Sequence, residues 1–211
     1  MKKLFVLGAS TIPGEFVVPR ILSVIIKRLP EIELKVDISD SLVTIKKVKA
    51  GVLELGIVGT RYDDSDEIEY LPVMKDDRLL VIAPPDHPLV GKKGITLADL
   101  KGQDFINREY GSGTRDAYER AFKDAGVPPG SLNIVAELND TEGIIQAVEG
   151  GAGLSVVSEL AAGDAIQMGK VVVLDIPLLK ITRDFYIITK RTRSLSPDAT
   201  QVLNVLKEIL G

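Results

Sequence analysis

Two stretches of the chain, VKAGVLELGIV at residues 48–58 and VEGGAGLSVV at residues 148–157, repeat one pattern. In each stretch a helical segment ends at glycine, and a run of apolar residues follows a few positions later. Glycine commonly ends helices, and an apolar run without alternation is typical of a strand that is buried on both faces. The repetition indicates two similar α/β lobes of roughly 100 residues each, which is a common size for a domain. One doubly wound sheet is the alternative that the pattern leaves open.

The composition fits a folded protein and excludes several classes of function. The 211 residues are 45% apolar and 27% charged, which is ordinary for a globular chain. No cysteine is present, so disulfides, thiolate metal sites and a cysteine nucleophile are ruled out. The net charge of -4 makes the chain a poor binder of nucleic acid on its own. No apolar run approaches the roughly 20 residues of a membrane span, so we expect no membrane partner.

Strands and helices alternate along the chain. Apolar patterning predicts strands at residues 4–7, 34–38, 55–58, 68–73, 78–83, 105–106, 134–138, 154–157, 171–174 and 185–189. It predicts helices at residues 16–29, 41–50, 97–100, 114–125, 139–149 and 197–210. Pro19 is tolerated only in the first turn of a helix, so we expect the first helix to start near Phe16. Asp40 or Ser41 is expected to cap the second helix.

Small polar residues follow two predicted strands of the first half. Ser10 and Thr11 come directly after the strand at 4–7, and Thr60 follows the strand at 55–58. In open α/β sheets, ligands gather at the carboxyl ends of the strands. These hydroxyls are therefore candidates for ligand binding, while plain capping of the next helix is the alternative for Ser10 and Thr11.

The segment Arg108–Arg115, with the sequence REYGSGTR, carries the sharpest local signal in the chain. Gly111 and Gly113 allow the backbone to curl into a nest of N–H groups, which binds anions. Ser112 and Thr114 add hydroxyl donors, and Arg115 adds a planar cation. Anion binding is the prediction for this segment. The carboxylate of Glu109 opposes it unless Arg108 or Arg115 pairs with that group.

A third polar loop, at residues 137–142, precedes the helix predicted at 139–149. Asn139 as the cap, with Glu142 three residues later, resembles a capping box. Asn139 and Thr141 could also contact a ligand, whereas Glu142 is expected to act in capping alone.

Catalysis finds little support in the sequence. The single histidine, His87, lies in a turn between Asp86 and Pro88, and it is expected at the surface. There is no Gly-x-Ser-x-Gly elbow and no histidine or cysteine cluster for zinc. We therefore expect no enzymatic activity, no cofactor and no metal ion.

Four segments, taken in order, carry a likeness to a known family. They are GASTIPGEF at 8–16 with Pro19, LGIVG at 55–59 followed by LLVIAPPDHPL at 79–89, AVEGGAGLS at 147–155, and RDFYI at 183–187 followed by LSP at 195–197. Their order and spacing resemble the effector-binding domain of LysR-type transcriptional regulators, over essentially the whole chain.

This resemblance implies a periplasmic-binding-protein-like type II α/β fold, in which two Rossmann-like lobes are joined by two crossover segments. Lobe I would comprise residues 1–80 and 184–211, lobe II residues 81–183, and the ligand cleft would lie between them. Ser10 falls on an effector-contact position of the family, and Thr60 and Asn139 lie close to two others. The segment 111–115 is typical only of a subset, which includes regulators of sulfur and selenium metabolism.

The resemblance also implies the function. A cytoplasmic regulator would sense a small effector, an oxyanion or small carboxylate, through a change in the angle between lobes. DNA would be bound only through an N-terminal helix-turn-helix domain, which this chain does not contain; the chain is either an excised domain or a natural stand-alone one. A solute-binding protein that delivers an oxyanion to a transporter is the main alternative, and an enzyme on the same scaffold is the third.

The family further implies a homodimer, and a tetramer in the full-length regulator. The helix at 16–29 of one chain would pack antiparallel against the helix at 139–149 of its partner. Val17, Val18, Val24 and Ile25 give the first helix more apolar surface than one face needs, which is consistent with a second partner.

Overall fold

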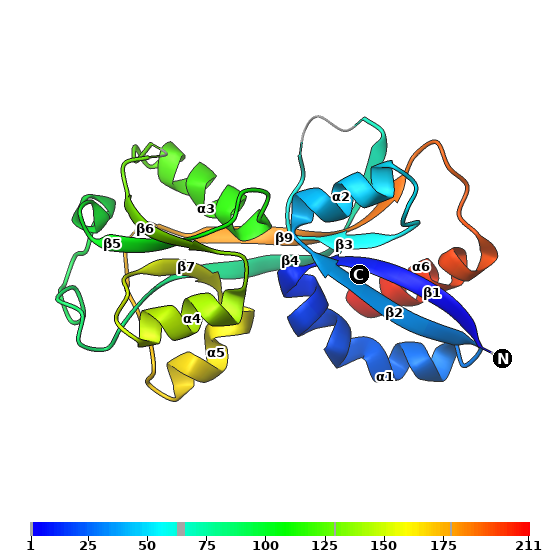
Figure 1. The fold of residues 1–211 in the computed structure, drawn as a ribbon, viewed down its shortest axis with the longest axis horizontal. Helices are drawn as coiled ribbons and strands as arrows, with labels where there is room; N and C mark the ends of the chain where they lie inside the picture. The colour runs from blue at the N-terminus through cyan, green and yellow to red at the C-terminus, as the bar shows by residue number, and fades with distance from the viewer. Residues whose placement is uncertain (1, 63–65, 129, 178) are drawn as a thin grey trace. The chain divides into compact units, whose positions relative to one another are not determined.

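The computed structural model of the protein describes residues 2–62, 66–128, 130–177 and 179–211. The chain divides into two compact units: unit 1 comprises Met1–Asp76 and Asp184–Gly211, and unit 2 comprises Asp77–Arg183. Two strands, β4 (Ile68–Ala83) and β9 (Ile181–Lys190), run through the points where the chain passes between the units. Figure 1 follows the chain from blue to red.

Unit 1 is built on parallel strands with helices on both faces. Its elements, besides parts of β4 and β9, are β1 (Lys3–Ser10), β2 (Ile32–Ser39), β3 (Gly56–Val58), α1 (Val18–Arg28), α2 (Ser41–Lys49) and α6 (Pro197–Leu210). Strand β1 pairs in parallel with β2 and β3, and β3 pairs antiparallel with β9. Helix α2 covers one face of these strands, and α1 and α6 pack together on the other (Figure 1).

Helical backbone precedes the predicted start of the first helix. Helical backbone begins at Thr11 and widens into a π-helical turn, η1 (Pro13–Val17), before α1. The N–H of Val18 donates to the carbonyl of Pro13, five residues back. Pro19 has no N–H and cannot continue the ordinary α-helical ladder, and a π turn is one of the ways in which a helix absorbs such a break. The α-helix proper, α1, begins at Val18 and carries Pro19 in its first turn, as expected, whereas the helical residues from Thr11 to Val17 extend beyond the prediction.

Unit 2 repeats the same layering. Its elements, besides parts of β4 and β9, are η2 (Leu97–Leu100), β5 (Asp104–Arg108), α3 (Gly113–Asp124), β6 (Asn133–Leu138), α4 (Thr141–Glu149), β7 (Ser155–Ser158), α5 (Glu159–Gln167) and β8 (Val172–Val173). Strand β4 pairs antiparallel with β7 and β8, and β5 pairs in parallel with β6. Helix α3 lies on one side of these strands, with α4 and α5 on the other (Figure 1). No helix in the described part of the chain is long and apolar enough to cross a membrane.

Two elements of the structure differ from the predicted pattern. The strands predicted at 68–73 and 78–83 form one strand, β4, with Asp76 in the left-handed region at φ 61°. Helix α5 was not predicted, because its alanines and Gly163 show no strong apolar stripe. The hydroxyl of Ser158 caps α5 by accepting from the N–H of Leu160 at 3.2 Å.

The repeated pattern of the sequence corresponds to two equivalent helix ends. After α2, the N–H of Gly51 donates to Val48; after α4, the N–H of Gly151 donates to Val148. Both glycines have positive φ, 73° and 82°, a conformation that strains residues with a Cβ atom. Each of these turns is followed by a buried strand, β3 or β7. The prediction that each segment is a helix ending at glycine, followed by a buried strand, is confirmed.

Gly153 provides a test of how closely the second turn packs. Its φ is 140°, and a Cβ atom there would lie 2.5 Å from the backbone oxygen of Asp104 in β5. We expect Gly153→Ala to lower the free energy of unfolding by about 3 kcal/mol, because strain and overlap with backbone add. At Gly151 a Cβ atom would meet nothing within 4 Å, so Gly151→Ala should cost only about 1 kcal/mol. Urea unfolding of both variants measures the difference, and equal costs would contradict the predicted overlap.

Candidate functional site

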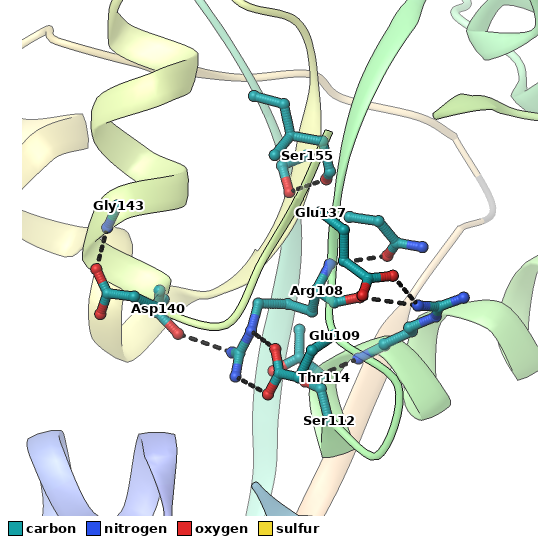
Figure 2. Close-up of polar contacts among 12 residues, drawn as sticks. Arg108, Glu109, Ser112, Thr114, Glu137, Asp140, Gly143 and Ser155 are labelled. Atoms are coloured by element: carbon teal, nitrogen blue, oxygen red, sulfur yellow. Dashed lines mark hydrogen bonds and ion pairs between the residues drawn. The ribbon is translucent and has the colours of Figure 1, made fainter. Parts of the chain in front are cut away.

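The candidate site of unit 2 forms where two neighbouring parallel strands end. Arg108, the last residue of β5, is in register with Leu138, the last residue of β6. The loops that follow these strands therefore start at the same edge of the sheet. A hydrogen bond of 2.8 Å from the Arg108 guanidinium to the Thr141 hydroxyl joins them. The structure thus joins Thr141 to Arg108 at the start of the loop that leads to residues 111–115, and Figure 2 shows Arg108 and Glu109 near Ser112 and Thr114.

The segment 111–115 forms the entry to helix α3. Gly111 has a φ of 95°, which lets the chain turn from β5 into the helix. The hydroxyl of Ser112 caps α3 by accepting from the N–H of Arg115. The N–H groups of Gly113 and Thr114 lie in the first turn, where a helix provides no acceptor of its own. The capping role of Ser112 is thus established, and anion binding by this segment remains a prediction.

Arg108 neutralises the carboxylate that counted against anion binding. Its side chain is 3% exposed, and its guanidinium donates to both oxygens of Glu109, at 2.7 and 2.8 Å (Figure 2). Such a paired geometry holds both groups in one orientation. Glu109 therefore presents no uncompensated negative charge to the loop.

Arg115 is engaged by the protein itself. Its guanidinium donates to Glu119 at 2.8 Å, to Glu137 at 2.8 Å and to the carbonyl of Arg108 at 3.0 Å. These contacts fasten the first turn of α3 to the ends of β5 and β6. The geometry of unit 2 gives Arg115 a structural role, and its contact with a ligand stays a prediction.

A second buried arginine, which sequence analysis did not single out as a site residue, reaches the same helix. Arg183 in β9 donates to Asp77 in β4 at 2.8 Å and to the hydroxyl of Thr114 at 3.0 Å. The side chains of Arg183 and Asp77 are 6% and 1% exposed. Burial lowers the pKa of the Arg183 guanidinium, and the Asp77 carboxylate acts in the opposite direction. Asp77 also accepts from the hydroxyl of Ser158 at the end of β7.

Unit 1 gathers its own predicted hydroxyls at one sheet edge. Ser10 ends β1, Thr11 follows it, and Thr60 follows β3, which pairs in parallel with β1. The three side chains belong to residues that are buried, with 4%, 9% and 3% of their surface exposed. Their positions at the carboxyl ends of adjacent parallel strands are those that the sequence predicts.

The predicted capping role of Asn139 is wrong. Asp140 caps α4, and its carboxylate accepts from the N–H of Gly143 at 2.6 Å (Figure 2). Asn139 is exposed and lies one residue before the cap. The sequence offers Asp140 directly after Asn139, and aspartate is as good a cap as asparagine. Asp140 was therefore an equally good candidate for the cap of α4. Glu142 accepts from Gln146 on the surface of the helix.

The charged residues that sequence analysis missed gave weak signals. Asp77 follows Asp76 in what reads as a polar turn, and Arg183 stands in a strand whose neighbours alternate between exposed and buried. A lone charge at an inward position of an alternating strand is the pattern that could have marked Arg183.

Metal ligands do not gather around these loops in the described part of the chain. Within residues 2–62, 66–128, 130–177 and 179–211, no cluster of three or more histidine, aspartate or glutamate side chains could hold a metal ion. His87 is half-buried, and its Nδ1 accepts from the N–H of Leu89 at 3.2 Å, so it shapes its own turn.

Two Rossmann-like α/β units connected by two strands, with polar loops at the carboxyl ends of parallel strands, define a ligand-binding domain of the type II periplasmic-binding-protein class. A family model described as the LysR substrate binding domain matches residues 2–211. The chain belongs to this family.

Curated relatives agree with the family. An uncharacterized HTH-type transcriptional regulator of Methanocaldococcus jannaschii is 35% identical over 193 residues, which cover 92% of this chain and 64% of that protein. The RuBisCO operon transcriptional regulator of Allochromatium vinosum is 34% identical over 191 residues, covering 90% of this chain and 61% of that protein. The chain thus spans about three fifths of the length of these relatives.

Solved structures confirm the fold class. The CcmR regulatory domain of Synechocystis PCC6803, in complex with 2-PG, superposes with a TM-score of 0.86 at 29% identity, covering 98% of this chain and 97% of that one. The cofactor-binding domain of the Cbl transcriptional regulator superposes with a TM-score of 0.83 at 18% identity, covering 100% and 90%. At 18% identity, the similarity to the Cbl domain supports the fold assignment alone.

The buried pair of Asp77 and Arg183 should be essential to the stability of unit 2. Asp77→Asn keeps the shape and removes the negative charge, which leaves Arg183 buried without its counter-ion. We expect the free energy of unfolding to fall by about 3 kcal/mol or more. Glu159→Gln is the matched control, because it breaks the exposed ion pair with Arg78 and should cost less than about 1 kcal/mol. Chemical denaturation measures both, and a small loss for Asp77→Asn would show that the pair is dispensable.

Proposed function

We propose that this chain is the ligand-sensing part of a LysR-type transcriptional regulator, and that its effector is a small oxyanion or carboxylate. The observation that carries the chemistry is a pair of hydroxyls in unit 2. Thr114 accepts a hydrogen bond from Arg183, and Thr141 accepts one from Arg108. Each hydroxyl oxygen is thereby occupied as an acceptor by a buried cation, so its own proton is available to a ligand. A positive donor also polarises the hydroxyl and makes it a better donor in turn.

Backbone groups complete this set of donors. The N–H groups of Gly113 and Thr114 start helix α3, whose dipole favours negative charge at this end. Ser112 and Thr114 are buried, with 2% and 3% of their surface exposed, so an anion bound to them would be shielded from water. In the proposed site Gly111 and Gly113 shape the loop, and Ser112, Thr114 and Thr141 surround the anion.

The comparisons support the biological setting of this proposal. The relatives described above are transcriptional regulators, which favours sensing over solute delivery or catalysis. The complex of CcmR with 2-PG supports a small-molecule effector for this chain. The family resemblance also predicts a contact of the effector with Ser10 and contacts close to Thr60 and Asn139, and Thr11 is a candidate from its place after β1. It further predicts regulation by a DNA-bound oligomer, and DNA contacts through a helix-turn-helix domain of the full-length protein.

Substitution of Thr114 tests the role of its hydroxyl. Thr114→Val preserves the shape of the side chain and removes the donor, so we expect the affinity for the effector to fall by about 1–3 kcal/mol. Thr114→Ser retains the hydroxyl and should bind nearly as the unaltered protein does. Calorimetric titration against sulfate, sulfite, phosphate and small carboxylates measures both affinities.

Comparing these affinities with the thermal stability of each variant distinguishes a hydroxyl that binds the effector from one that only supports the fold. Thr114→Val also removes the acceptor of Arg183, so its thermal stability without ligand should fall. If stability falls while every affinity stays unchanged, the hydroxyl is structural and does not contact the effector. If no anion binds the unaltered protein, the oxyanion proposal fails.

We further propose that the chain forms a homodimer through helix α1, against the partner's segment Asn139–Glu149. The structure narrows the apolar surface available for this contact. Val17, Val18 and Ile25 are buried within the chain, whereas Ile26 on α1 is 47% exposed. The excess of apolar residues noted in the sequence is therefore mostly used inside unit 1, and Ile26 is the residue that a partner would cover.

Ile26→Glu should weaken self-association by placing a charge in the proposed interface. Met168 at the end of α5 is 71% exposed and lies outside the proposed contact, so Met168→Glu serves as the control. Sedimentation equilibrium should show dimers for the unaltered protein and for Met168→Glu, and a shift toward the 22.8 kDa monomer for Ile26→Glu. Equal association of all three proteins would place the interface elsewhere.

A further inference from the structure

A cavity of about 190 Å³ lies within unit 2, beside helix α3 and away from its first two residues. Its apolar walls consist of Phe122, Val127, Pro128, Leu132 and Ile134. Asn107 and Tyr118 provide polar groups, and the ion pair of Arg115 and Glu119 also borders it. Ile134 is 42% exposed, which places the β6 side of the cavity near solvent.

The walls are held in place without an occupant. The ring of Tyr118 packs against those of Phe122 and Phe105, with centroids 5.3 and 6.0 Å apart. Tyr118 and Phe122 are each 2% exposed, and the Tyr118 hydroxyl donates to the side-chain oxygen of Asn107. Well-packed aromatic walls preserve the shape of a cavity and reduce the entropy lost on binding.

Asn107 supplies an unused donor to this space. The residue is 4% exposed, and its side-chain oxygen accepts from the N–H of Arg108 and from the hydroxyl of Tyr118. The backbone N–H of Arg108 can only donate, so the Asn107 atom that it meets is the oxygen, and the amide nitrogen takes the other position. Among the described residues, that nitrogen has no hydrogen-bond partner. This nitrogen is accessible from the cavity rather than sealed in the core, so an occupant with an acceptor can bind it directly.

The lining sets the chemistry of the occupant. A dry cavity of roughly 150 Å³ is enough to hold a benzene molecule, so the present space suits one ring with a small substituent. Arg115 at the border is paired with Glu119 and Glu137, so it offers no free cation to an anion, and any charged occupant would lose its water against mostly apolar walls. Burial raises the pKa of the Tyr118 phenol, which keeps that wall neutral as well.

We propose that this cavity is a second small-molecule site, distinct from the anion site proposed at Ser112, Thr114 and Thr141, with Arg115 at the border between the two, and that it takes a neutral one-ring compound with a single hydrogen-bond acceptor directed at Asn107. The apolar walls cover the ring, and the amide N–H groups of Asn107 bind the acceptor.

Two probes of nearly equal shape test the site and its donor. Acetophenone carries a carbonyl oxygen, and α-methylstyrene has a CH2 group in its place. In a titration followed by 1H–15N NMR, acetophenone should shift the backbone signals around Phe122, Val127 and Leu132 saturably, and also the side-chain amide signals of Asn107. α-Methylstyrene should bind about tenfold more weakly, since it leaves the donor unpaired. Equal binding of the two probes would overturn the role of Asn107, and no saturable shift with acetophenone would overturn the site.

Closing the entrance provides the second test. Ile134→Trp places a large ring at the lining and should abolish the shifts caused by acetophenone. Val135→Trp is the matched control: it is the next residue of β6, 49% exposed, and it does not line the cavity. The spectra of both variants without ligand report whether each is folded. Retained binding in Ile134→Trp, or equal loss in both variants, would show that acetophenone binds elsewhere.

Discussion

A buried ion pair is the interaction on which unit 2 depends. Asp77 on β4 and Arg183 on β9 are almost fully buried, and removing two such charges from water costs several kcal/mol for each ion. The cost is offset because neither group relies on the other alone. Asp77 also binds the hydroxyl of Ser158, and Arg183 also binds that of Thr114. The pair therefore connects two strands to the end of β7 and to the first turn of α3, and it fixes the loop that is proposed to bind the effector.

The same chemistry explains how an acidic protein could recognise an anion. Each arginine near the proposed site has a carboxylate partner: Arg108 has Glu109, Arg115 has Glu119 and Glu137, and Arg183 has Asp77. A site without a bare cation attracts anions only over a short range. Recognition then depends on neutral donors whose direction is fixed, because hydroxyls and backbone N–H groups must meet the oxygens of the ligand at hydrogen-bond distance. Such a site selects by shape as well as by charge.

The sequence predicted the elements that depend on local signals. Buried strands and glycine-terminated helices follow from apolar runs and from backbone preference, and the two glycine turns are present as expected. Features that depend on distant partners were missed. Asp77 reads as part of a turn until Arg183, which is 106 residues away, is placed beside it. Pro19 lies in the first turn of α1 as predicted, but the π turn that precedes it was not predicted. For the candidate site, the hydroxyls could be named from their places after strand ends, whereas the hydrogen bonds from Arg108 to Thr141 and from Arg183 to Thr114 could not be predicted.

Helix α3 connects the two proposed sites through one side chain. Its first turn carries Ser112 and Thr114, and its later turns supply Tyr118 and Phe122 to the cavity. Arg115 belongs to both regions, because it borders the cavity and donates to the carbonyl of Arg108, the arginine that orients Thr141. An occupant that moved Arg115 would therefore alter contacts at the carboxyl ends of β5 and β6. A chain of direct hydrogen bonds is a physical connection between sites, and the energy of coupling depends on whether Arg115 has a second stable arrangement. Its three partners within unit 2 favour one arrangement, so an occupant is expected to stabilise the first turn of α3 rather than to displace it.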